Sequence, residues 1–122
     1  MVIDKKFVDQ LIKVTSKAAL ASSYFVGKKD KIAADKAAVD SMRFNLNNLD
    51  IQGKIVIGEG ELDEAPMLYI GEKLGTNIGP EFDIAVDPLE GTNFAANNLP
   101  GALSVIAIAE KNNLFFSYGY NR

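Results

Sequence analysis

Two stretches near the start of the chain place apolar residues at helical spacing. Over residues ~4–25, apolar side chains recur at steps of three and four while lysines fall mostly elsewhere, and Gly27 follows as a stop signal. Residues 33–47 repeat the pattern, with apolar positions at steps of four. The sequence therefore predicts two amphipathic helices, separated by a short polar segment.

The remainder of the chain has the features of strands and turns. Short β-branched or apolar runs end at Gly, Asn or Asp, as is typical of strands. Residues 91–101 are rich in Gly, Asn and Pro and predict a loop, whereas residues 64–75 are compatible with either a helix or a strand. The predicted strands are residues 54–57, 82–86 and 103–109, with a hairpin partner at 114–116.

Two helices followed by several strands predict an α+β fold. We expect the two N-terminal helices to pack on a mixed, mostly antiparallel sheet. At 122 residues, the chain is long enough for one domain with a core and too short for two ordinary ones. The aromatic residues that follow the last predicted strand have no later element to cover them, which suggests a domain cut short. They are Phe115, Phe116, Tyr118 and Tyr120.

Composition narrows the classes of function. Apolar residues make up 48% of the chain and charged residues 24%, values typical of a globular protein. A net charge of −3 argues against a nucleic-acid partner, and the lack of a long apolar span argues against a membrane partner and predicts a cytoplasmic location. The chain has no Cys and no His, so any metal must be held by oxygen, which favours Mg²⁺, Mn²⁺ or Ca²⁺.

The candidate chemistry begins in residues 83–92. Asp87 and Glu90 end an apolar run, and Gly91 and Thr92 follow at once. Carboxylates at a strand end can hold hard divalent cations, while backbone N–H groups after the turn can face a phosphate. The alternative is an exposed acidic turn. Thr92 could cap a helix or orient an attacking water with its hydroxyl.

A second acidic cluster lies upstream, in residues 58–64. Glu59 directly follows a predicted strand, and glycines on both sides permit close approach of a ligand. It is therefore the natural third metal ligand. Its neighbours Glu61, Asp63 and Glu64 are more typical of solvated charges, although so many adjacent carboxylates repel one another unless a cation compensates.

Two further features are ambiguous from the residues alone. Asp35 lies in an Ala-rich stretch near a helix start, where a carboxylate could simply interact favourably with the helix dipole. Lys28, Lys29 and Lys31 could meet a phosphate, but a charge run before a helix is usually solvated.

Residues 55–76 and 83–92 closely resemble class II fructose-1,6-bisphosphatases, some of which also hydrolyse sedoheptulose-1,7-bisphosphate. Residues 30–39 resemble the same family. The Asp-Pro-Leu-Glu-Gly-Thr element alone would indicate only the wider lithium-sensitive sugar and inositol phosphatase superfamily. Residues 93–101 depart from the class II pattern and are similar to the inositol monophosphatase branch.

The resemblance implies a metal-dependent hydrolysis of the C1 phosphate of fructose 1,6-bisphosphate, a step of gluconeogenesis, with Mn²⁺ or Mg²⁺ as cofactor. It implies metal ligands at Asp35, Glu59, Asp87 and Glu90. It places the substrate phosphate against Glu90, Gly91 and Thr92, and gives catalytic roles to Thr92, Asp35 and Glu59.

Members of the resembled family are far longer, so residues 1–122 are expected to form only the N-terminal metal- and phosphate-site portion of the domain. The expected partners are a sugar bisphosphate and either further copies of the chain or a complementing C-terminal chain. Two alternatives stay open: an inactive remnant or half of a split enzyme, and a phosphatase resembling inositol monophosphatase.

Overall fold

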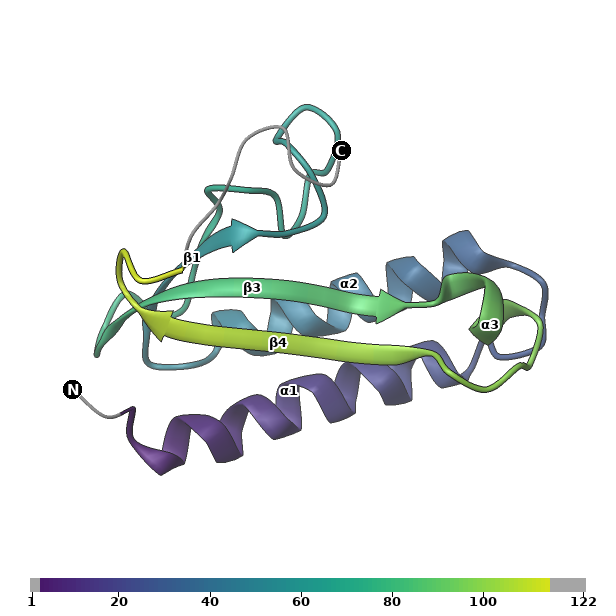
Figure 1. The fold of residues 1–122 in the computed structure, drawn as a ribbon, viewed down its shortest axis with the longest axis horizontal. Helices are drawn as coiled ribbons and strands as arrows, with labels where there is room; N and C mark the ends of the chain where they lie inside the picture. The colour runs from purple at the N-terminus through teal and green to yellow at the C-terminus, as the bar shows by residue number, and fades with distance from the viewer. Residues whose placement is uncertain (1–2, 115–122) are drawn as a thin grey trace.

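The computed structural model describes residues 3–114 (Figure 1). Two long helices come first, and four strands and a short helix follow in the described part of the chain. Among the described residues, no helix is both long and apolar enough to span a bilayer. In chain order the elements are α1 (Lys5–Ser23), α2 (Lys31–Asn47), β1 (Gln52–Ile57), β2 (Lys73–Leu74), β3 (Glu81–Glu90), α3 (Thr92–Ala96) and β4 (Leu103–Glu110).

Both predicted helices are present, and an aspartate caps each of them. The Asp4 carboxylate accepts the Lys6 N–H at 2.9 Å, and the Asp30 carboxylate accepts the Ala33 N–H at 3.0 Å. These bonds satisfy backbone donors that a helix start leaves free. The cap at Asp30 explains why α2 starts before the predicted residue 33.

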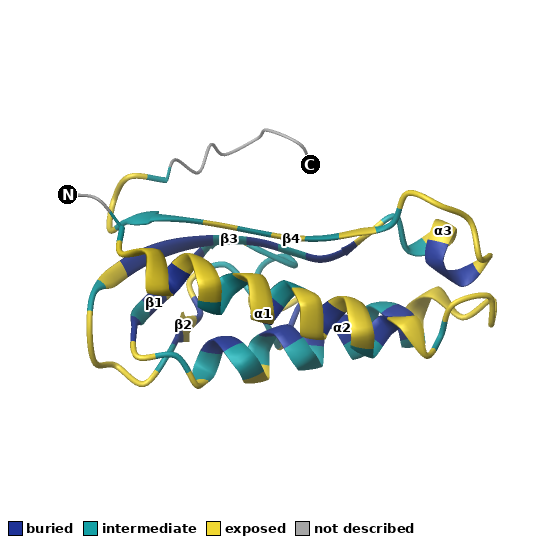
Figure 2. Cartoon of the chain, turned by 90° about the horizontal axis from the view of Figure 1, so that it is seen from below, coloured by how far each residue is buried: buried dark blue, intermediate teal, exposed yellow. Residues whose placement is uncertain are grey.

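The strands form one sheet in the order β2-β1-β3-β4. β1 pairs in parallel with β3, and the other two pairings are antiparallel, which confirms the predicted mixed, mostly antiparallel sheet. Both long helices lie on one side of the sheet, and buried residues concentrate between the two layers (Figure 2). Fully buried side chains in this core include Val14, Met42, Leu46, Ile55 and Ile84.

The structure corrects several predicted boundaries. β3 continues to Glu90 instead of ending at Val86, and the predicted loop 91–101 contains the short helix α3. The ambiguous residues 64–75 contain only the two-residue strand β2 and otherwise turns. In the predicted hairpin partner only Leu114 is described, and it lies in a bend. The rest of that partner and the aromatic tail lie outside the described residues.

The packing of α1 on the sheet depends on an aromatic pair. The rings of Phe7 and Phe82 meet edge to face, with centroids 5.2 Å apart. We expect Phe82→Ala to lower the free energy of unfolding by about 3–5 kcal/mol, because Phe82 is only 3% exposed and its loss leaves a cavity. Phe44→Ala is the matched control, since Phe44 is 69% exposed, and should change stability by less than about 0.5 kcal/mol. Chemical denaturation measures both. Equal losses would contradict the assignment of Phe82 to the core.

Candidate active site

The parallel pairing of β1 with β3 determines where the acidic residues meet. Gln52 pairs with Glu81 and Ile57 with Ala85, so the two carboxyl ends reach the same edge of the sheet. Glu59 follows β1 by two residues, and Asp87 lies near the end of β3. Carboxyl ends of strands are a common place for a ligand site in sheets of this kind.

The helices bring two more predicted residues to this edge. The connection between α1 and α2 is hydrogen-bonded to α3: Gly27 N–H donates to Ala95 O at 2.9 Å, and Lys29 N–H donates to Ala96 O at 2.8 Å. The start of α2, which carries Asp35, therefore lies beside α3, which carries Thr92.

The result is a single open pocket of about 420 Å³ that contains four of the predicted site residues. Asp35 comes from α2, Glu59 from the segment after β1, Asp87 from β3 and Thr92 from α3. Its remaining lining residues are Lys31, Ile32 and Leu89.

The end of β3 is irregular, and the irregularity bears on Glu90. Asp87 pairs with Val105 and Glu90 with Leu103, so three steps along β3 match two steps along β4. This is a one-residue bulge, and it contains the buried Pro88, a residue that strands tolerate at bulges. In a regular strand, residues three apart face opposite sides, whereas the extra residue returns Glu90 to the side of Asp87.

The carboxylates are close enough to perturb one another. Burial and then the charges of Asp35 and Asp87 raise the pKa of Glu59 to about 7. Burial and then the charge of Asp87 raise the pKa of Asp35. The pKa of Asp87 is raised by burial and then by Glu90, against a smaller lowering by a backbone hydrogen bond at Leu89. Such mutual destabilisation of the charged forms is a mark of functional sites.

The structure contradicts one of the two roles predicted for Thr92, that of a helix cap. The N-cap of α3 is Gly91, in a left-handed conformation with φ of 81°, and Thr92 is the first residue of the helix. Thr92 is therefore not the cap. A Cβ on Gly91 would lie 2.9 Å from the Phe94 ring, so both the backbone angle and the space favour glycine there. Thr92 is one of the residues that line the pocket.

Some charged residues near the site line the pocket and others do not. Glu90 is exposed and does not line the pocket, although its charge acts on Asp87. Asp63 and Glu64 are exposed and do not line it either. Lys31 lines the pocket and is exposed, so the predicted solvation of residues 28–31 holds while Lys31 also borders the site. Its position four residues before Asp35 on α2 was the available signal, because residues so spaced are neighbours on a helix.

The donor set of the pocket fits a hard divalent cation. It offers carboxylate and hydroxyl oxygens, and burial together with the neighbouring carboxylate charges raises the pKa of Glu59. Within residues 3–114, no three acidic side chains are grouped closely enough to hold a metal as they stand.

A larger pocket of about 570 Å³ lies at the opposite ends of β1 and β3. It is lined by residues such as Gln52, Phe82 and Lys111 and contains none of the predicted site residues. The shared position and the perturbed pKa values of the carboxylates make the smaller pocket the candidate active site.

The fold and the pocket define an α+β protein with an acidic site at the carboxyl ends of two parallel strands. The sequence profile of the family described as bacterial fructose-1,6-bisphosphatase, glpX-encoded, matches residues 5–119. The chain belongs to this family, as its sequence predicts.

Similar curated proteins carry the name D-fructose 1,6-bisphosphatase class 2/sedoheptulose 1,7-bisphosphatase. The one from Prochlorococcus marinus is 48% identical over 113 residues, which cover 93% of this chain and 34% of that protein. The one from Thermosynechococcus vestitus is 51% identical over 118 residues, covering 87% of this chain and 34% of that protein. The chain thus spans about a third of the length of these relatives.

A solved structure shares the fold. An extragenic suppressor from Pyrococcus furiosus superposes with a TM-score of 0.56 at 18% identity, covering 88% of this chain and 41% of that one. At this identity, the likeness concerns the architecture only.

The raised pKa of Glu59 predicts how stability depends on pH. A pKa of about 7 in the folded state, against 4.5 ordinarily, means that the folded protein binds this proton more tightly than the unfolded chain. Protonation of Glu59 therefore raises the free energy of unfolding. This stabilisation is full below about pH 4.5 and is lost as the pH rises through about 7. Without divalent cations, we expect Glu59→Gln to be more stable than wild type at about pH 8, by on the order of 1 kcal/mol, because solvent screens a half-buried group.

Urea denaturation at about pH 5 and about pH 8, in the presence of a chelator, measures this difference. Glu64→Gln is the control, because Glu64 is exposed and does not line the pocket. A wild-type protein and a Glu59→Gln variant with the same pH dependence would contradict the prediction.

Proposed function

We propose that the chain supplies the metal- and phosphate-binding part of a sugar-bisphosphate phosphatase that hydrolyses the C1 phosphate of fructose 1,6-bisphosphate. The observation that carries this proposal is the convergence of Asp35, Glu59, Asp87 and Thr92 on one pocket, in a chain of the fructose-bisphosphatase family. The names of the curated relatives support the substrate class and a place in carbohydrate metabolism. A cytoplasmic location belongs to the same proposal.

The acidic residues have a common role in this reaction. Asp35, Glu59 and Asp87, together with Glu90, would hold Mn²⁺ or Mg²⁺. The cation supplies charge compensation for the phosphoryl oxygens and the leaving oxygen when bound. The carboxylates would hold the cation in a defined position. Positioning and electrostatics suffice for phosphoryl transfer, which suits a site without His or Cys.

Thr92 and the backbone beside it act on the other reactants. The Thr92 hydroxyl orients the attacking water in line with the phosphorus, and Glu90, Gly91 and Thr92 contact the phosphate. One of the two carboxylates, Asp35 or Glu59, accepts the single proton that this water loses, as a general base would. These roles rest on the pocket geometry for Thr92, Asp35 and Glu59, and on the family for Glu90 and Gly91.

The match to about a third of each relative supports assigning residues 1–122 to the N-terminal portion of the family's domain. In this proposal, groups that contact the sugar come from outside the chain, either from a complementing C-terminal chain or from further copies in a homo-oligomer. An inositol-monophosphatase-like activity is the competing substrate assignment, and it rests on the departure of residues 93–101 from the class II pattern.

A chimaera provides a complete protein for the test. We expect residues 5–114 of this chain, exchanged for the matching part of the Thermosynechococcus relative, to give Mn²⁺- or Mg²⁺-dependent phosphate release from fructose 1,6-bisphosphate. In that chimaera, Asp87→Asn should lower kcat/KM by on the order of 10²-fold or more, because a metal ligand stabilises several kcal/mol of transition-state charge. Asp63→Asn, which removes an exposed charge outside the pocket, should leave activity nearly intact.

Equal losses from Asp87→Asn and Asp63→Asn would contradict the choice of ligands. Faster phosphate release from inositol 1-phosphate than from fructose 1,6-bisphosphate would favour the competing substrate. The unmodified 122-residue chain is assayed in parallel, because turnover by it alone would show that no complementing chain is needed.

A further inference from the structure

We propose that Arg43 and Glu72 form a positioning pair that fixes Glu59 in the acidic pocket through the backbone of Leu68. The proposal rests on the proposed function, because it gives Glu59 a role in cation binding. Arg43 and Glu72 are both outside the pocket lining, so they would act on the site only through the segment between β1 and β2.

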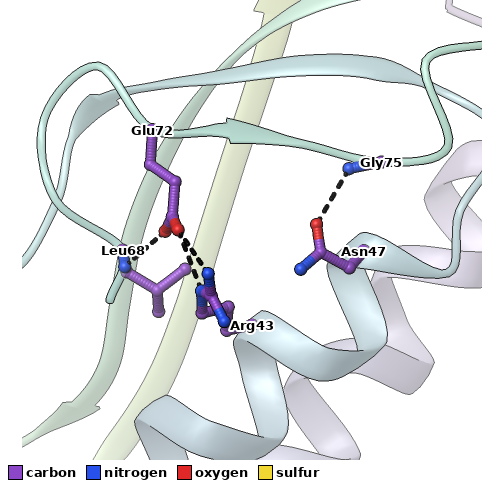
Figure 3. Close-up of polar contacts among 5 residues, drawn as sticks. All are labelled: Arg43, Asn47, Leu68, Glu72 and Gly75. Carbon is purple, nitrogen blue, oxygen red and sulfur yellow. Dashed lines mark hydrogen bonds and ion pairs between the residues drawn. The ribbon is translucent and has the colours of Figure 1, made fainter. Parts of the chain in front are cut away.

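The Glu72 carboxylate is buried and has a partner on each oxygen (Figure 3). Arg43 Nε donates to Glu72 Oε2 at 2.9 Å, and Arg43 Nη2 lies 2.9 Å from the same oxygen. Glu72 Oε1 accepts the Leu68 N–H at 2.6 Å. The Glu72 side chain is only 6% exposed, so its charge needs these partners to remain in the protein interior.

The backbone of Leu68 is held in an unusual conformation. Its φ of 55° lies in the left-handed region, which a bulky residue rarely adopts, and its side chain is fully buried. Such a conformation persists only when the surroundings impose it. The hydrogen bond from Leu68 N–H to Glu72 and the burial of the Leu68 side chain provide this constraint.

Leu68 connects the pair to the candidate metal ligand. The Leu68 carbonyl accepts the Glu59 N–H at 2.9 Å, and a Cβ on Gly58 would overlap the same carbonyl oxygen. A second bond, from Ile70 N–H to Gly60 O at 2.9 Å, closes the segment on the other side of Glu59. The backbone at Glu59 is thus fixed by contacts with residues 68–70.

The helix α2 holds this segment through Arg43 and the residue after β2 through Asn47. Arg43 and Asn47 lie four residues apart on α2, and Asn47 Oδ1 accepts the Gly75 N–H at 3.2 Å (Figure 3). The same helix carries Asp35. The position of α2 therefore determines the position of Asp35 directly. It determines the position of the Glu59 backbone through Arg43, Glu72 and Leu68. The two repelling carboxylates are thereby kept at a fixed separation.

The test uses the 122-residue chain and two readouts. Hydrogen exchange by NMR follows the amides of Glu59 and Leu68 against those of β3, and calorimetry measures Mn²⁺ affinity. We expect Arg43→Met to speed exchange at Glu59 and Leu68 about tenfold more than in β3, because it releases this segment locally. Mn²⁺ affinity should fall about tenfold, as when a group that orients a metal ligand is lost.

Further variants separate positioning from general stability. Arg43→Lys should recover part of both properties, since it keeps the charge without the fork of donors. Lys111→Met is the control: it breaks the exposed Lys111–Glu81 ion pair of 3.2 Å and should change neither readout. If Arg43→Met does not fold, Glu72→Gln is measured instead, because it keeps the size of the side chain and removes its charge.

Unchanged exchange at Glu59 and Leu68, or a uniform change that includes β3, would overturn the proposal. A wild-type chain that binds no Mn²⁺ would refute the cation site of the proposed function. The exchange readout would still decide whether the pair fixes Glu59, so the two failures are distinguishable.

Discussion

The site depends on the parallel alignment of β1 with β3. Parallel neighbours end at the same edge, so the residue that follows β1 and the carboxylate near the end of β3 must meet there. The connection between the two strands has to leave this edge and return to the other one. It does so through residues 58–80, which include β2, and it passes the pocket with Glu59 at its start. The helices α1 and α2 cover one face of the sheet (Figure 2).

Alignment alone would leave the carboxylates free to separate. Burial and mutual repulsion raise the pKa values of Asp35, Glu59 and Asp87, which means that the folded protein holds them together at a cost. The backbone must resist that repulsion. Asp87 lies in β3 and is paired with Val105 of β4, whereas Glu59 lies on a segment of turns. This difference explains why the strained backbone and the buried Glu72 carboxylate occur beside Glu59.

The sequence predicted the parts of this structure that depend on local pattern. The apolar spacing of residues 4–25 and 33–47 predicted both long helices, and the acidic motifs predicted Glu59 and Asp87, which line one pocket. The bulge in β3 could not be predicted, because Pro88 normally marks the end of a strand and only the pairing with β4 shows otherwise. Likewise, the buried position of Glu72 could not be predicted, because its partner Arg43 is 29 residues away in the sequence. Contacts between distant segments decide both features.

The fold does not by itself determine the reaction, because one fold can carry many functions. The charge of the pocket constrains function more closely. Among its described lining residues, three are carboxylates and Lys31 is the only cation. A sugar bisphosphate carries several negative charges and would be repelled by this set. At short range in a partly buried site, such repulsion amounts to several kcal/mol for each pair of charges. In the proposed function the cation therefore has a second role, because it would reverse the sign of the pocket before a phosphate enters.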